Sequence, residues 1–123
     1  MSTIHNTAII GSNVTIGDNV TIGPYSIIED GVKIANNNII KSSVFITGQT
    51  DIGDKNVFHP FCSIGSPPQD LKFNNEITKL TIGSDNIFRE YANVNVGTEG
   101  GGGITSIGNN SLFMVGAHIA HDC

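Results

Sequence analysis

The sequence lacks tryptophan and contains only six Phe and two Tyr residues, which excludes a thick core built on large aromatic side chains. The apolar volume must instead come from the many Ile and Val residues, whose β-branched side chains favour strands. Charged residues make up 14% of the chain, against roughly 25% in an average globular protein. The six Lys and Arg residues are scattered and the net charge is −5, so the sequence predicts no nucleic-acid partner.

Long apolar runs are also missing. No segment approaches the roughly 18 residues that span a bilayer, and the first residues lack the basic and apolar regions of a signal peptide. We therefore expect no transmembrane segment and a cytoplasmic location. The two cysteines, Cys62 and Cys123, fit neither a disulfide framework nor a zinc knuckle, so free thiols are expected. The length predicts one domain, residues 1–123.

What the sequence does have is a repeat of large apolar residues at every sixth position. The first series has no exception: Ile4, Ile10, Ile16, Ile22, Ile28, Ile34, Ile40, Ile46, Ile52, Phe58 and Ile64. After two interruptions the series continues with Ile82, Phe88, Val94, Ile107, Phe113 and Ile119. A six-residue period does not match the 3.6-residue repeat of an amphipathic helix, whereas a short strand, a corner and another short strand fit it.

A second pattern follows the first, because the fourth residue after each apolar marker is small or of modest size. These residues are Ala8, Val14, Val20, Ser26, Val32, Asn38, Val44, Thr50, Asn56, Cys62, Asn86, Ala92, Ser111, Ala117 and Cys123. Turn-forming triplets such as Gly17-Asp18-Asn19 stand in between. We therefore predict an all-β fold, a parallel β-helix of about five to six triangular coils stacked roughly 4.8 Å apart. Each buried marker Ile should contribute about 1.5–3 kcal/mol.

The two interruptions predict loops that leave the solenoid, at about residues 66–81 and 97–103. Continuing the coil through the first would aim Asp70 and Glu76 into the core, where unpaired carboxylates are costly, and Pro67 and Pro68 cannot donate to a strand ladder. The glycine-rich second interruption lacks the Lys-Ser/Thr pair of a phosphate-binding loop. We therefore expect two insertions.

Three chemically active residues lie close together near the last residue of the sequence: His118, His121 and Asp122. Neither histidine occupies an inward position of the repeat, so both should project from the solenoid wall. An imidazole can accept a proton from a hydroxyl near neutral pH, and a neighbouring carboxylate can orient it. Incidental surface histidines are one alternative. A metal site is a weaker one, because residues three apart in an extended chain face opposite sides.

Three stretches together resemble a known family. They are Gln69-Asp70-Leu71-Lys72, then Arg89-Glu90 with Gly97-Thr98 and the glycine run, and finally the stretch from Ala117 to Cys123. The pattern is similar to the hexapeptide-repeat proteins and, more narrowly, to the acyl-[acyl-carrier-protein]–UDP-N-acetylglucosamine O-acyltransferases that begin lipid A biosynthesis. The resemblance implies a left-handed parallel β-helix.

By this resemblance the protein is an acyltransferase and a homotrimer with active sites between subunits. It moves an (R)-3-hydroxyacyl group from acyl carrier protein to the 3-hydroxyl of UDP-N-acetylglucosamine, without a metal or other cofactor. The resemblance assigns its residues as follows: His121 as general base, Asp122 as its orienting partner, and Gln69, Asp70, Lys72, His118 and Asn95 as substrate-binding residues. Asn95 stands where many relatives carry a histidine.

The resemblance covers only the N-terminal portion of the family. Further coils and a helical C-terminal domain, which hold the acyl-chain pocket and the basic residues for uridine diphosphate and carrier protein, are expected to be absent from these 123 residues. Two other functions stay open: a truncated, non-catalytic β-solenoid remnant, or another hexapeptide-repeat enzyme such as a coenzyme A-dependent sugar acetyltransferase or a trimeric zinc hydratase.

Overall fold

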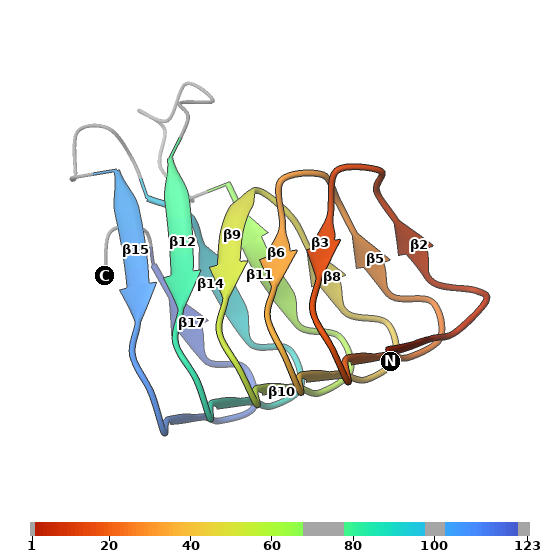
Figure 1. Ribbon diagram of the computed structural model, residues 1–123. Helices are drawn as coiled ribbons and strands as arrows, with labels where there is room; N and C mark the ends of the chain where they lie inside the picture. Colours follow the sequence, from red (N-terminus) through yellow and green to blue (C-terminus); the bar gives the residue numbers. More distant parts are fainter. Residues whose placement is uncertain (1, 68–77, 98–102, 121–123) are drawn as a thin grey trace.

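The chain winds into a triangular solenoid with three walls, each a parallel β-sheet (Figure 1). The computed structural model describes residues 2–67, 78–97 and 103–120, and all the strands below lie in these ranges. Most strands have two residues, as the six-residue repeat requires. The predicted all-β parallel solenoid is confirmed.

The three sheets take every third strand. Sheet 1 contains β1 (Thr3–Ile4), β4 (Thr21–Ile22), β7 (Ile39–Ile40), β10 (Val57–Phe58), β13 (Ile87–Phe88) and β16 (Leu112–Phe113). Sheet 2 contains β2 (Ile9–Ile10), β5 (Ile27–Ile28), β8 (Phe45–Ile46), β11 (Ser63–Ser66), β14 (Asn93–Asn95) and β17 (His118–Ile119). Sheet 3 contains β3 (Thr15–Ile16), β6 (Lys33–Ile34), β9 (Gln49–Ile52), β12 (Lys79–Ile82) and β15 (Ile104–Ile107).

Strand pairing shows where the winding is interrupted. In a regular coil, residues 18 apart pair, as Ile34 pairs with Ile52. Ile52 pairs with Ile82, 30 residues on, and Ile82 pairs with Ile107, 25 residues on. The two insertions therefore add twelve and seven residues, without changing which side chains face inward.

The first insertion is shorter than the sequence predicts. Ser66 belongs to β11, and residues 79–81 belong to β12, although both were expected in a loop at about 66–81. The reason is that Leu80 and Ile82 alternate with polar residues and both point into the core, where they are 0% and 2% exposed. They therefore pair in register with Thr50 and Ile52.

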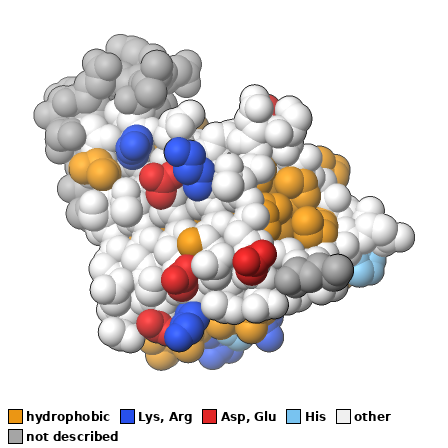
Figure 2. Space-filling view, in the orientation of Figure 1, with side chains coloured by type: hydrophobic (Ala, Val, Ile, Leu, Met, Phe, Trp, Pro, Cys, Tyr) orange, Lys and Arg blue, Asp and Glu red, His pale blue; other side chains and the backbone are white. Residues whose placement is uncertain are grey.

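The apolar markers form the core. From Ile22 to Phe88 every described marker is at most 3% exposed, and three phenylalanine rings continue the stack, with centroids of Phe58, Phe88 and Phe113 each 4.8 Å from the next. Ile4 lies on β1, the edge strand of sheet 1 among the described residues, and is 43% exposed. Figure 2 shows hydrophobic side chains gathered at this end of the solenoid, beside β2 and β3.

A second, polar column is buried beside the apolar one. Asn38, Asn56 and Asn86 occupy the fourth position after their markers and are 0% exposed. The Asn56 backbone amide donates to Asn38 Oδ1 (2.8 Å), the Asn86 amide donates to Asn56 Oδ1 (3.0 Å), and the Asn56 side chain donates to the Gly83 carbonyl (2.9 Å). These carboxamides satisfy backbone groups at a corner that the strand ladder does not reach.

The outer surface of sheet 3 carries charges of both signs without a single-sign patch (Figure 2). Its outward residues are Thr15, Lys33, Gln49, Asp51, Lys79, Thr81, Ile104 and Ser106. In the described part of the chain, no helix is long and apolar enough to cross a membrane.

Candidate active site

The two predicted site residues that the structure describes, Asn95 and His118, belong to β14 and β17 of sheet 2. Parallel pairing of β14 with β17 places Asn93 beside His118, and pairing with β11 places Ser63 on the other side of Asn93. His118 is exposed and precedes the inward residue Ile119. It therefore projects from the wall, as the repeat predicts. Its contact with substrate stays a prediction.

The outer face of sheet 2 changes character along the solenoid. In the order β2, β5, β8, β11, β14 and β17, its outward residues are Ile9, Ile27, Phe45, Ser63, Asn93 and His118. The first three are apolar and the last three can form hydrogen bonds. Among these outward positions, hydrogen-bonding side chains are therefore confined to the coils that carry the insertions.

Asn95 lies two residues after Asn93 but is only 2% exposed. Its Nδ2 donates to Asn93 Oδ1 (3.0 Å) and to Ser66 Oγ (3.2 Å), while no described residue donates to its Oδ1. The sequence predicts that Asn95 contacts substrate. The structure shows a buried carboxamide whose donor is used within the protein, and its contact with substrate stays a prediction.

A β-bulge at Gly65 brings Ser66 into reach of Asn95. The pairing register of β11 shifts between Ile64 and Ser66, and Gly65 has φ +84°. A Cβ atom at Gly65 would collide with the Thr47 carbonyl oxygen and with Thr50 Oγ1. Only glycine adopts this conformation without strain, so the bulge is specified by the sequence.

Five predicted site residues lie outside the described residues: Gln69, Asp70, Lys72, His121 and Asp122. Their roles stay predictions. The described residues that flank the two insertions are close together, since Val96 N donates to Ser66 O (3.2 Å) and Gly97 N donates to Lys79 O (3.1 Å). The described residues at which the two insertions start and end are therefore hydrogen-bonded to one another, and Ser66 and Gly97 are close to Asn95.

Three titratable residues come directly after strands of sheet 1. Lys41, His59 and Arg89 each stand one residue after an inward marker, and the sequence did not single them out as a site. Burial lowers the pKa of His59, and the charges of Arg89 and Lys41 lower it further against the opposing effect of Glu90. Arg89 Nε donates to Glu90 Oε1 (3.0 Å). The shared spacing after the markers could have revealed this column.

Cys62 is a buried free thiol and is not part of the predicted site. Burial raises its pKa to about 11, and its Sγ lies 3.0 Å from the Arg89 carbonyl oxygen, to which it donates. A thiol with a raised pKa is a poor nucleophile at neutral pH. Cys62 is therefore a core residue.

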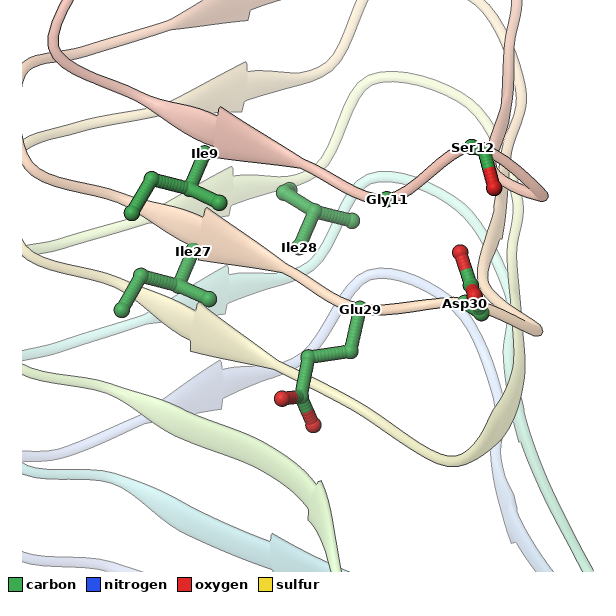
Figure 3. Close-up of a pocket in the computed structure, with 7 residues that line it drawn as sticks. All are labelled: Ile9, Gly11, Ser12, Ile27, Ile28, Glu29 and Asp30. Atoms are coloured by element: carbon green, nitrogen blue, oxygen red, sulfur yellow. The ribbon is translucent and has the colours of Figure 1, made fainter.

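A groove of about 240 Å³ lies near the other end of sheet 2, between β2 and β5 (Figure 3). Ile9, Ile27 and Ile28 form its apolar side, and Glu29 and Asp30 are at its other side. Asp30 Oδ1 accepts from the Asn13 amide (2.9 Å) and Glu29 Oε1 from Thr47 Oγ1 (2.6 Å). Three strands separate it from His118, so it is a separate feature.

Within residues 2–67, 78–97 and 103–120, no three His, Cys, Asp or Glu side chains lie close enough to hold a metal ion. Of the three residues weighed as metal ligands in the sequence, only His118 is in these ranges.

Sequence comparison places the chain close to one group of enzymes. A family model described as bacterial transferase hexapeptide (six repeats) matches residues 1–29 and 13–48. The chain is 55% identical over 122 residues to the acyl-[acyl-carrier-protein]–UDP-N-acetylglucosamine O-acyltransferase of Rickettsia bellii, covering 99% of this chain and 43% of that protein. For the protein of the same name from Rickettsia canadensis, the identity is 52% and the coverage 99% and 46%. The chain spans less than half the length of these curated relatives.

Solved structures give the same result. The UDP-N-acetylglucosamine O-acyltransferase of Moraxella catarrhalis is 46% identical with a TM-score of 0.96, covering 98% of this chain and 47% of that one. The LpxA protein of Acinetobacter baumannii is 43% identical with a TM-score of 0.96, covering 98% and 46%. This likeness confirms the left-handed parallel β-helix.

Proposed function

From the homology of this chain, over 99% of its length, to part of the acyl-[acyl-carrier-protein]–UDP-N-acetylglucosamine O-acyltransferases, we propose that it is the N-terminal portion of such an enzyme. The enzyme transfers an (R)-3-hydroxyacyl group from acyl carrier protein to the 3-hydroxyl of UDP-N-acetylglucosamine, in the cytoplasm, as the first step of lipid A biosynthesis. The observation that carries this proposal is the 55% identity over 122 residues, 99% of this chain.

The chemistry rests on His121. Its neutral imidazole accepts the proton of the sugar 3-hydroxyl while the hydroxyl oxygen attacks the thioester carbonyl carbon. The carbon–sulfur bond then breaks, and the proton passes from the imidazolium to the leaving thiolate of the carrier protein. Asp122 orients the ring and stabilises its charged form, as a carboxylate does in other histidine-dependent acyl transfers. The reaction needs no metal or other cofactor.

In this proposal the substrate is bound by residues of the first insertion and by residues on the outer face of sheet 2. Asp70 accepts hydrogen bonds from sugar hydroxyls, Lys72 binds the donor or the diphosphate, and Gln69 lies in the same loop motif. His118 hydrogen-bonds the substrate from its exposed position on β17. Its neighbour in sheet 2 is Asn93, so the described part of the site already presents polar groups on one surface.

We also propose that the protein is a homotrimer whose clefts combine residues of two subunits. Apolar side chains on the outer faces support this, since Ile87 and Leu112 on sheet 1 are 39% and 56% exposed and Ile9 on sheet 2 is 64% exposed. Burial of such side chains against another copy would stabilise the assembly. Sedimentation equilibrium should give three times the chain mass, and a monomer at micromolar concentration would contradict the proposal.

The decisive experiment replaces the proposed base. In the chain extended to the length of its relatives, His121→Ala should lower kcat for transfer from acylated carrier protein by about 10²–10⁴-fold. His5→Ala, which removes another exposed histidine in the first coil, is the matched control and should retain full activity. Unchanged turnover in His121→Ala would exclude the base.

The identity of the acyl donor distinguishes this proposal from the two alternative functions. The wild-type extended protein should use acylated carrier protein and not acetyl coenzyme A. Turnover with acetyl coenzyme A alone would favour a different hexapeptide-repeat acetyltransferase, and no turnover with any donor would favour a non-catalytic solenoid.

A further inference from the structure

Asn93 was not singled out by the sequence, yet it occupies the centre of the polar row on sheet 2. It lies on the outer face between Ser63 and His118 in the strand register, and it is half-buried. Adjacent strands in a sheet are about 4.8 Å apart, so the side chains of Asn93 and His118 reach the same ligand-sized region.

The orientation of the Asn93 carboxamide is fixed by a buried neighbour. Asn95 Nδ2 lies 3.0 Å from Asn93 Oδ1, so the oxygen accepts from within the protein. Because Asn95 is 2% exposed and also donates to Ser66 Oγ (3.2 Å), it is held in place. The two branches of a planar carboxamide point apart, so Asn93 Nδ2 is directed away from Asn95.

The hydrogen bond to Asn95 uses only the oxygen of the Asn93 carboxamide, and no described residue accepts from its Nδ2. Asn93 Nδ2 is not among the buried atoms without a partner, so it is open to solvent and available to donate to a ligand. A carboxamide is also neutral, so it suits a hydroxyl or carbonyl oxygen of a sugar.

We propose that Asn93 is a substrate-binding residue whose Nδ2 donates a hydrogen bond to a hydroxyl or carbonyl oxygen of the nucleotide sugar beside His118. Asn95 is then a positioning residue that acts through Asn93. This inference rests on the proposed function, since it identifies a further contact of the same site.

Two substitutions at Asn93 distinguish binding from a structural role. Asn93→Asp keeps an oxygen that can accept from Asn95 but removes the donor, whereas Asn93→Ala removes both. In the extended protein, each should raise KM for UDP-N-acetylglucosamine by about 3–10-fold, the effect of one lost hydrogen bond, with less change in kcat. Gln49→Ala removes an exposed carboxamide from sheet 3 and should leave KM unchanged.

If Asn93 only anchors Asn95, Asn93→Asp should retain the wild-type KM, and that result would overturn the inference. An unchanged KM in Asn93→Ala would do so as well. Thermal unfolding of each variant shows whether it is folded, and an inactive wild-type protein would contradict the proposed function rather than this contact.

Asn95 provides an independent check. Asn95→Ala should raise the same KM by a similar factor, and the double variant should be no worse than Asn93→Ala alone, because both changes remove one contact. Fully additive effects would show that Asn95 does not act through Asn93.

Discussion

The coils before Gln49 and the coils after it share one core but differ on the outside. In both, the inward markers between Ile22 and Phe88 are at most 3% exposed and pair in the same register, whereas the markers nearest the two ends are only partly buried. The early coils are uninterrupted and carry apolar Ile9, Ile27 and Phe45 on sheet 2, whereas the later coils carry two insertions, a bulge and a polar row. The inward half of each hexad thus builds the scaffold and the outward half is free to vary with function.

The largest effect should come from breaking the core that the two regions share. Phe88→Ala removes the central ring of the stack and should lower the free energy of unfolding by about 3–5 kcal/mol, measured by urea denaturation. Ile28→Ala in the early coils should cost about 2–5 kcal/mol. Ile87→Ala, at a neighbouring position that is 39% exposed, is the control and should cost far less. A tolerated Phe88→Ala would show that the later coils do not depend on this core.

The next effect should be specific to the later coils. Gly65→Ala places a Cβ against the Thr47 carbonyl oxygen in a left-handed conformation, and should destabilise the protein by about 2–3 kcal/mol. Gly108→Ala is the matched control, because its Cβ would meet no atom within 4 Å. Equal unfolding midpoints for both variants would mean that the bulge is not constrained.

The asparagine column crosses from early to late coils and should have a smaller effect. Asn56→Ala leaves the Asn86 amide and the Gly83 carbonyl without their side-chain partner, which should cost about 1–3 kcal/mol. Asn6→Ala, an exposed residue of the first coil, should change stability by less than about 0.5 kcal/mol. Differential scanning calorimetry measures both, and a neutral Asn56→Ala would show that water replaces the carboxamide.

The smallest effect concerns pH. Burial raises the pKa of Cys62 to about 11 in the folded protein, above its ordinary value of 9.0, so the unfolded chain loses this proton first. Stability should therefore fall as pH rises from about 9 to 11, and Cys62→Ala should remove that part of the dependence. Denaturation midpoints across this range measure the effect. Parallel curves for wild type and Cys62→Ala would contradict the buried, protonated thiol.

The sequence predicted the scaffold because the period of the repeat depends only on which side chains face inward. Ile22, Phe58 and Ile82 are buried where the six-residue count places them. The asparagine column was seen only as a set of modest-sized residues, since apolar periodicity carries no information on hydrogen bonds. The limits of the first insertion were misplaced because Leu80 begins the pattern again within a segment rich in turn and charged residues.

The site was predicted less completely. The outward position of His118 follows from the repeat, but the burial of Asn95 depends on neighbouring segments and on the bulge at Gly65, which strand alternation cannot predict. The proposed role of Asn93 rests on its hydrogen bond to Asn95, a contact within one strand that has no sequence signature. The roles of His121 and Asp122 come only from the family resemblance.

The unequal lengths of the two insertions have a practical consequence. One adds twelve residues, a multiple of six, and the other adds seven, yet Ile52, Ile82 and Ile107 stack in one unbroken column. The register of each strand is therefore set by its pairing with the strand of the preceding coil. It does not depend on the number of residues between the two strands. The length of an insertion at these two joints is therefore not restricted to multiples of the six-residue repeat.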